Sequence, residues 1–278
     1  MRPFLIARLL CAGLALTSSA CDGQLSDSVH SLRTLGGSGA TADRDELGRG
    51  RGPKPTIVLV HGAFADGSSW QELIPLLQHD GFTVVAVQNT LTSLANDIIT
   101  TRRVIDAQVG PVVVVGHSYG GAVVTGAATG GANVKALVYI AAFAPDANEP
   151  IGALNAKYPS DLGAALRPDA AGYLYIDGAA FHDVFAADLP LPTTRVMAVE
   201  QKPLNSMAFG EFVTVPAWKS IPSWYVVATQ DHAISPDLER FYAKRMGAKT
   251  TELRSSHVPF LSQPEAIVKV IRAAAEGM

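Results

Sequence analysis

Three residue types that together perform nucleophilic acyl transfer occur in this chain in a specific order. Ser118 stands between glycines in the stretch GHSYGG (116–121), and Asp231 and His257 follow further along the chain. A serine hydroxyl is a poor nucleophile at its ordinary pKa, so it needs a general base, which a carboxylate commonly orients. The order predicts a site in which Ser118 attacks, His257 takes its proton and Asp231 orients His257.

The residues around Ser118 favour an exposed nucleophile. Residues 112–115 are four consecutive valines, which is typical of a strand buried on both faces, and the small residues 121–130 predict a packed helix. A sharp strand-to-helix turn pushes its central residue toward unfavourable backbone angles, and the flanking glycines let both elements approach closely. This is the G-x-S-x-G pattern of a nucleophile elbow. An ordinary glycine-flanked turn is the alternative, and the valine run argues against it.

The base is chosen among the three histidines that follow Ser118. His257 lies in SSHVPFL, just past a short predicted strand, and therefore at the same sheet edge as Ser118. His182 lies in an irregular segment, and His232 directly follows the strand predicted over 223–229. The sequence therefore favours His257.

Two aspartates compete for the role of the acid. Asp231 closes the stretch SWYVVATQD, so it lies at the carboxyl edge of a strand. Asp237 follows Pro236 and suits the first turn of a helix, where a negative charge is favourable. We therefore predict Asp231 as the partner of His257.

The developing oxyanion needs backbone N–H donors. One is predicted at Tyr119, directly after the nucleophile. The second should come from the loop in LVHGAFADGSSW (59–70), where the N–H of Ala63 is the first choice and Phe64 the second. A glycine-rich connection that caps the next helix through Asp66 or Ser68 is compatible with this role. Residues predicted to order these loops, rather than to act as bases, are His61, Gly62 and His117.

The elements that position these residues alternate between strands and helices. Strands are predicted at 56–60, 83–87, 112–115, 135–143, 223–229 and 250–254, and helices at 70–80, 94–108, 121–130, 238–247 and 265–277. Such alternation predicts an α/β fold with a mostly parallel sheet covered by helices on both faces. Residues 144–222, with nine prolines, interrupt the pattern and predict an inserted, partly helical cap that lines a pocket.

Composition and the N-terminal segment set the broad class. The 278 residues are 48% hydrophobic with a net charge of −3, which indicates a globular protein and gives no basis for binding nucleic acid. Residues 1–20 predict a secretory signal, 21–55 a flexible tether and 56–278 the folded domain. We expect Ser19-Ala20-Cys21 to act as a lipobox that places a lipid anchor on Cys21, with ordinary cleavage after Ala20 as the alternative. We expect an exported protein, periplasmic or membrane-anchored.

The segments LVHGAFADGSSW, GHSYGG, VVATQD and SSHVPFL together resemble serine α/β-hydrolases of the esterase and hydroxynitrile-lyase-like branch. The resemblance spans residues 56–277. It implies an α/β-hydrolase fold, a triad of Ser118, Asp231 and His257, and oxyanion donors at Ala63 and Tyr119. It also implies a small-molecule ester as substrate, with neither a metal nor an organic cofactor.

The implied activity is that of a carboxylesterase acting on small to medium hydrophobic esters. The lyases of this branch carry a lysine where this chain has Val258 and a threonine where it has Gly62, which argues against cyanohydrin cleavage. Two alternatives remain open at this point. One is the cofactor-free perhydrolase or haloperoxidase-like chemistry that shares the same triad, and the other is a non-catalytic binding role on the same fold.

Overall fold

Residues 54–278, the part of the chain that the computed structural model describes, contain a six-stranded parallel sheet. Its strands are β1 (Thr56–Val60), β2 (Thr83–Ala86), β3 (Val112–Ser118), β4 (Val134–Ala142), β8 (Ser223–Ala228) and β9 (Lys249–Leu253). The spatial order is β2-β1-β3-β4-β8-β9, and every neighbouring pair is parallel. The predicted fold class is confirmed.

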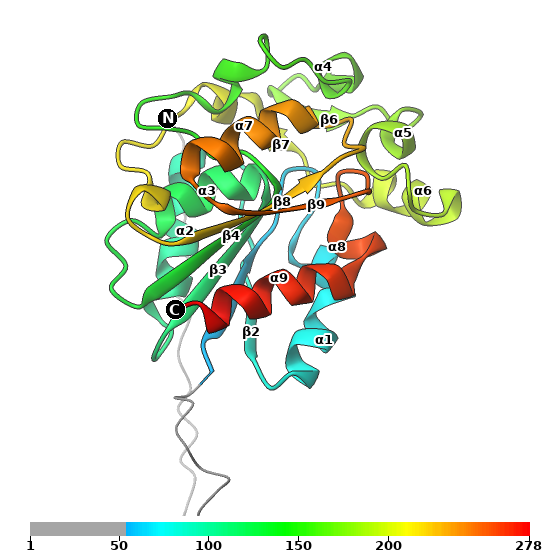
Figure 1. Ribbon diagram of the computed structural model, residues 1–278. Coiled ribbons are helices and arrows are strands. Elements are labelled where there is room, and N and C mark those ends of the chain that lie inside the picture. Colours follow the sequence, from blue (N-terminus) through cyan, green and yellow to red (C-terminus); the bar gives the residue numbers. More distant parts are fainter. Residues whose placement is uncertain (1–53) are drawn as a thin grey trace, which may run out of the picture. The chain divides into compact units, whose positions relative to one another are not determined.

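Helices cover both faces of this sheet (Figure 1). One face carries α1 (Leu73–His79) and α9 (Pro264–Glu276), and the other carries α2 (Leu94–Asp106), α3 (Tyr119–Ala127) and α7 (Pro236–Met246). A short helix, α8 (Pro259–Ser262), precedes α9. Because both faces are covered, every residue of β1 and β3 is buried, which explains their continuous apolar runs.

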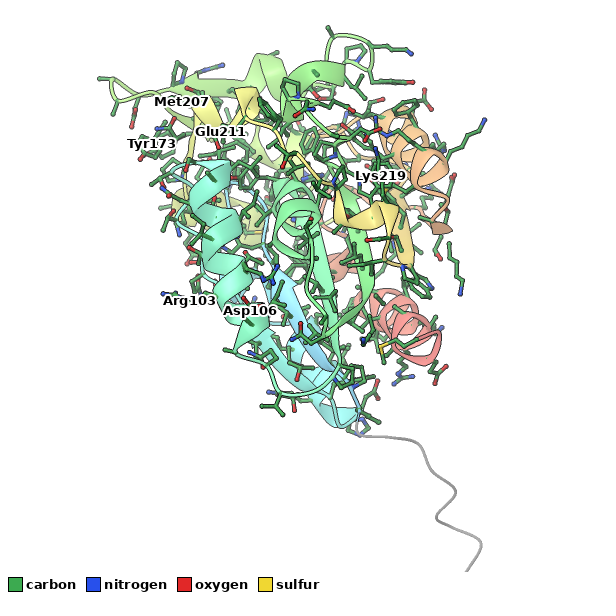
Figure 2. All side chains as sticks on the ribbon, turned by 90° about the vertical axis from the view of Figure 1, so that its left-hand side faces the viewer. Arg103, Asp106, Tyr173, Met207, Glu211 and Lys219 are labelled. Carbon is green, nitrogen blue, oxygen red and sulfur yellow. The ribbon has the colours of Figure 1, made fainter. Side chains whose placement is uncertain are left out.

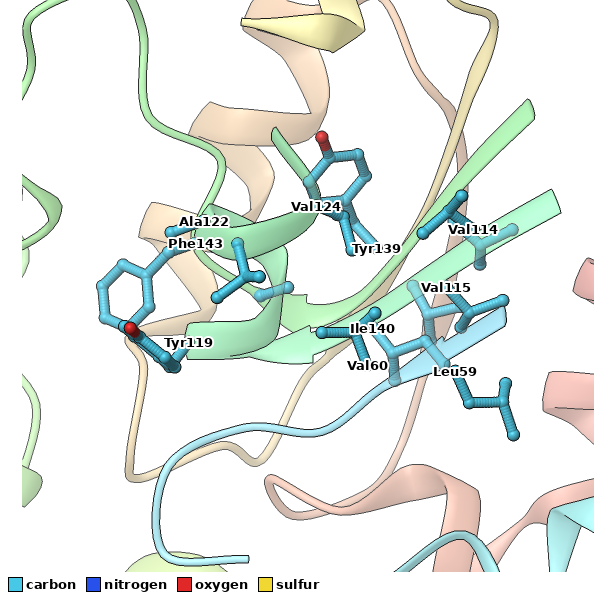
Figure 3. Packing of buried hydrophobic residues seen from close by; sticks show 14 of the residues in the cluster. Leu59, Val60, Val114, Val115, Tyr119, Ala122, Val124, Tyr139, Ile140 and Phe143 are labelled. Carbon is cyan, nitrogen blue, oxygen red and sulfur yellow. The ribbon is translucent and has the colours of Figure 1, made fainter. Parts of the chain in front are cut away.

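The core is densest where β3 and β4 meet α3. Figure 3 shows side chains of β1, β3 and β4, among them Val115 and Ile140, packed beside residues of α3 such as Val124. Fully burying a side chain of this size stabilises the fold by about 1.5–3 kcal/mol. The buried Tyr139 hydroxyl is satisfied by Thr125 Oγ1 at 2.9 Å. This hydrogen bond joins α3 to β4.

The strand order creates a crevice at the ends of β1 and β3. These two strands are neighbours, but the chain leaves β1 toward β2 on one side and leaves β3 toward β4 on the other. Ligands in open α/β sheets bind beyond the carboxyl ends of strands at such a switch point. The loop after β1 begins at His61, and β3 ends at Ser118, so both predicted elements of the site lie at this crevice.

The insertion between β4 and β8 contains more than the predicted helices. Its helices are α4 (Leu162–Ala165), α5 (Phe181–Phe185) and α6 (Leu191–Glu200), with 3₁₀ turns at Ile151–Leu154, Ser206–Gly210 and Ala217–Lys219. It also forms an antiparallel sheet of β5 (Leu166–Pro168), β6 (Tyr173–Ile176) and β7 (Leu204–Asn205). Strands of two to four residues are too short to show alternation, so the sequence did not predict them.

The cap is tied to the rest of the domain by specific polar contacts. Glu211 Oε2 accepts a hydrogen bond from the Ala95 N–H, in the first turn of α2, at 3.0 Å. Figure 2 shows Glu211 beside one end of α2, whereas Arg103 and Asp106 mark the other end. A negative charge is favourable at a helix N-terminus, so this contact stabilises the closed arrangement of cap and helix.

The predicted signal segment (1–20) and most of the predicted tether (21–55) lie outside the described residues. None of the helices in residues 54–278 combines the length and apolar character that a membrane crossing requires.

Candidate active site

Ser118 occupies a strained turn between β3 and α3. Its backbone has φ 53° and ψ −124°, a conformation that a residue with a Cβ rarely adopts. The glycines on either side are required by close approach. A Cβ at Gly116 would lie 2.7 Å from the Gly120 carbonyl oxygen, and one at Gly120 would lie 2.5 Å from that of Val60. The tight turn thus positions Ser118 at the edge of the sheet, 7% exposed.

Asp231 and His257 meet through a short hydrogen bond. Nδ1 of His257 lies 2.5 Å from Oδ2 of Asp231, and both side chains are buried. Asp231 follows β8 and His257 follows β9, so the two neighbouring strands bring them together. The backbone N–H groups of Ala233 and Ile234 donate to Oδ1 of Asp231 at 2.6 and 2.9 Å. These bonds fix the carboxylate, and the Asp231 contact at Nδ1 leaves Nε2 of His257 as the nitrogen that can accept a proton.

The competing residues have other partners. Asp237 is exposed in the first turn of α7 and pairs with Arg240 at 3.0 Å. His182 lies in α5 beside the Thr194 hydroxyl at 3.1 Å, and His232 pairs with Asp161 at 2.6 Å. None of these three contacts involves His257.

Ser118 adjoins the loop after β1, and its neighbour His117 contacts the loop of the base histidine. A Cβ at Gly62 would lie 2.8 Å from the Ser118 Cβ, so Gly62 packs directly on the nucleophile. His117 connects the elbow to the base, because its Nε2–H donates to the His257 carbonyl at 2.9 Å and the two rings are 4.6 Å apart. Within residues 54–278, Ser118 Oγ makes no hydrogen bond. Catalytic hydrogen bonds often tighten only when substrate is bound.

His61 orders the loop that carries the predicted oxyanion donors. Its Nε2 accepts the Asn89 N–H at 3.0 Å, so Nδ1 carries the proton and donates to the Gly62 carbonyl at 2.8 Å. Burial lowers the pKa of His61, which keeps it neutral. In the described part of the chain, the N–H of Ala63 has no hydrogen-bond acceptor, so it is available to a ligand. Phe64 follows with φ 60°, and its ring packs edge-on against that of Phe185 in the cap, with 6.3 Å between the ring centroids.

Tyr119 is held by a buried carboxylate that the sequence did not single out. Tyr119 is the first residue of α3, so its backbone N–H has no acceptor within the helix. Its hydroxyl donates to Asp97 Oδ2 at 2.9 Å, and the other Asp97 oxygen accepts the N–H groups of Thr90 and Leu91. Burial, and then the charge of Asp97, raise the pKa of Tyr119 above its usual range. Asp97 therefore anchors the residue that carries one predicted oxyanion donor.

A further residue missed from the sequence is Asp188 in the cap. Its two carboxylate oxygens accept the Ser256 N–H, at 3.0 Å, and the Ser256 hydroxyl. Ser256 directly precedes His257, so these hydrogen bonds join the cap to the loop of the predicted base. No local signal could have identified Asp188, because it lies in an irregular segment and its partner is 68 residues away.

A cavity of about 590 Å³ adjoins the site. The apolar part of its wall comes from the loop after β1, the cap and the base loop, and includes Phe64, Phe185, Leu189, Val258 and Phe260. His117 also lines it, and the Phe185 ring lies 5.0 Å from the His257 ring. In the region 54–278, no group of three or more His, Cys, Asp or Glu side chains is arranged to hold a metal ion.

With this fold and geometry, the chain belongs to the α/β-hydrolase family, whose model matches residues 57–270. It is 26% identical to "Probable hydrolase R7" of a Phoma species, over 78% of this chain and 97% of that protein. It is 24% identical to polyneuridine aldehyde esterase of Rauvolfia serpentina, over 77% and 93%. The solved structure of an extracellular α/β-hydrolase from a Paenibacillus species has the same fold, with a TM-score of 0.68 and 19% identity, over 79% of this chain and 98% of that one.

These findings confirm the family resemblance that the four sequence segments indicate. Distant esterases are among the relatives, including a plant methylesterase of Arabidopsis thaliana at 22% identity. The chain is therefore an α/β-hydrolase related to ester-cleaving enzymes.

Proposed function

We propose that this protein is a serine hydrolase, a carboxylesterase that cleaves small to medium hydrophobic esters through an acyl-enzyme on Ser118. The main support is the buried hydrogen bond between His257 Nδ1 and Asp231 Oδ2. His117 joins the loop of His257 to the strained turn at Ser118. A base that a carboxylate orients, on a loop joined to the turn of the nucleophile, is the arrangement that acyl transfer by a serine requires.

The reaction proceeds in two steps. Ser118 Oγ attacks the ester carbonyl carbon while His257 Nε2 takes the hydroxyl proton, and the imidazolium is stabilised by Asp231. The carbonyl π electrons move onto oxygen; when the tetrahedral intermediate collapses, the C–O bond to the alcohol breaks and His257 returns the proton to that oxygen. Water then attacks the acyl-enzyme by the same route, which releases the acid and restores Ser118.

The oxyanion of each tetrahedral intermediate is stabilised by the backbone N–H groups of Ala63 and Tyr119. Both belong to segments fixed by buried side chains: His61 holds the first loop and Asp97 holds Tyr119. N–H donors that the fold already holds in place need no reorganisation when the negative charge develops. One such donor contributes about 10²–10³-fold to the rate.

The cavity beside the site supports a hydrophobic substrate. Three aromatic rings (Phe64, Phe185 and Phe260) form much of the apolar part of its wall, whereas the polar part includes Asp66, Glu72 and Glu200. Its 590 Å³ falls within the size range of sites for small molecules. Similar proteins also support a hydrophobic ester as substrate. One is a carbendazim-hydrolysing esterase, 33% identical over 36% of this chain, and another is a pyrethroid hydrolase of similar fold with a TM-score of 0.69.

A serine-directed fluorophosphonate probe tests this function without knowledge of the natural substrate. The wild-type protein should be labelled on Ser118, and Ser118→Ala should not be. Asp237→Asn is the matched control, because Asp237 lies on the surface of α7 and pairs with Arg240, so this variant should be labelled like the wild type. Absence of labelling in folded wild-type protein, together with no turnover on an ester panel, would contradict the proposal.

We also propose that the protein is exported and anchored by a lipid on Cys21. The support is in the sequence alone, namely the apolar segment with Arg2 and Arg8 followed by Ser19-Ala20-Cys21.

A further inference from the structure

A second carboxyl group is buried beside the predicted acid. Glu239, in α7, has no exposed surface, and its Oε2 accepts the Ala228 N–H at 2.9 Å. Ala228 is the last residue of β8, and Asp231 follows it after a short turn. Glu239 therefore joins α7 to the end of β8, just before the turn that presents Asp231.

The hydrogen bonds around these two carboxyls leave one oxygen of Glu239 without a donor. Asp231 receives three hydrogen bonds, two from the backbone N–H groups of Ala233 and Ile234 and one from His257. Glu239 Oε1 is buried and accepts no hydrogen bond. An ionised Glu239 would leave this oxygen charged, desolvated and close to a second carboxylate, which is highly unfavourable.

The charged groups near Glu239 do not compensate a charge on it. Asp231 faces it from the loop after β8, and Tyr225 lies near it on β8 with its hydroxyl already bonded to the Ala142 backbone. Arg240, next along α7, lies at the surface and binds Glu252. Burial first, and then the charge of Asp231 and hydrogen bonding with it, raise the pKa of Glu239 well above its usual value.

We propose that Glu239 is a positioning residue whose neutral carboxylic acid donates a hydrogen bond from Oε1 to Asp231. This hydrogen bond sets how strongly the Asp231 carboxylate stabilises a protonated His257. The inference rests on the proposed esterase function of the same site. With the proton on Oε1, that oxygen becomes a donor, and both oxygens of Glu239 are satisfied. The fourth donor to Asp231 withdraws negative charge from it, so the acid limb of the pH–rate profile should lie at lower pH than it would without Glu239.

The pH dependence of kcat/KM on p-nitrophenyl butyrate tests the proposal with two substitutions. Glu239→Gln keeps a neutral donor and an acceptor in place, so the acid limb should keep its position. Glu239→Leu removes the donor and should shift the acid limb upward by about half to one pH unit. A downward shift in Glu239→Gln would mean that an ionised carboxylate had been neutralised, which overturns the proposal. An unshifted limb in folded Glu239→Leu would reduce Glu239 to a purely structural residue.

An infrared measurement separates this proposal from the proposed function. At pH 7 the folded Ser118→Ala protein should show the C=O stretch of a protonated carboxyl group, and Ser118→Ala/Glu239→Gln should lack it. Glu252→Gln, which alters an exposed glutamate paired with Arg240, is the control and should retain both the band and the ester turnover. Absence of the band in Ser118→Ala would overturn the role of Glu239, even if Glu239→Leu fails to fold. If Ser118→Ala shows the band but the wild-type protein turns over no ester, the esterase function alone would be contradicted.

Discussion

Nδ1 of His257 lies 2.5 Å from Oδ2 of Asp231, and neither side chain is more than 1% exposed. A hydrogen bond between two groups that water does not reach fixes the tautomer of the histidine, because Nδ1 must carry the proton. Nε2 is then free to take a proton from a nucleophile. The proposed general-base role of His257 depends on this hydrogen bond.

Replacement of Asp231 by asparagine tests this relationship. The amide cannot stabilise an imidazolium, and it favours the wrong tautomer of His257, so kcat for ester hydrolysis should fall by about 10³–10⁴-fold with little change in KM. Steady-state kinetics on p-nitrophenyl butyrate measure both constants. Asp237→Asn provides the comparison, and equal losses in the two variants would count against Asp231 as the acid.

The backbone strain at Ser118 should lower the free energy of unfolding, and a substitution that relieves it should raise that free energy. Glycine adopts a φ of 53° with a ψ of −124° far more readily than serine or alanine does. Ser118→Gly should therefore raise the free energy of unfolding above that of Ser118→Ala by about 1–3 kcal/mol, while both variants lose activity. Urea denaturation of the two variants measures the difference. Equal midpoints would show that the elbow is not strained.

The contact of Asp188 with Ser256 should affect turnover from the cap. Asp188→Ala removes both hydrogen bonds that hold the residue before His257, so the base should lose its alignment and kcat should fall by about 10–100-fold. Ser256→Ala removes only the hydroxyl and keeps the backbone N–H bond, so its loss should be smaller. If the two variants have the kcat of the wild type, the base loop does not depend on the cap.

Stability should fall as the pH is lowered from about 7 toward 5. Burial lowers the pKa of His61 and, more strongly, that of His117. The unfolded chain takes up protons on these residues near pH 6.5, and the folded chain does not, so unfolding becomes easier as the pH falls toward the folded pKa values. The slope is at most about 1.4 kcal/mol per pH unit for each histidine. His117→Gln should reduce it, and an unchanged slope would contradict a neutral, buried His117.

The anchor predicted at Cys21 can be tested in cells. If Cys21 is lipidated, Cys21→Ser should move the protein from the membrane fraction to the soluble exported fraction, and globomycin should block its maturation. Fractionation with an antibody to the folded domain measures both effects. Soluble export that neither treatment changes would favour ordinary cleavage after Ala20.

The sheet and its elbow could be predicted because their signals are local. A run such as residues 112–115 can be satisfied only by a strand with both faces covered, and Gly116 and Gly120 prepare the turn. The boundaries differ from those predicted by a few residues at most; for example, α2 ends at Asp106 where residues up to 108 were expected. The placement of Asp231 beside His257 followed from the rule that parallel strands end at one edge.

The supporting residues could not be predicted, because their partners are distant in sequence. In the sequence, Asp97 is an ordinary acidic residue of the first turn of α2, and Glu239 is one polar residue among several in α7. Only the tertiary structure shows that both are buried. Asp188 and the short strands of the cap depend on contacts across the insertion, which carries no periodic signal. Such residues are visible only once the tertiary structure is known.

Hydrolysis of p-nitrophenyl acetate and butyrate by purified residues 22–278, measured beside the Ser118→Ala variant, tests whether Ser118 is the nucleophile. We expect turnover by the parent protein and a loss of at least about 10³-fold in the variant, with the same unfolding midpoint. Equal turnover by both proteins would contradict a nucleophilic role for Ser118.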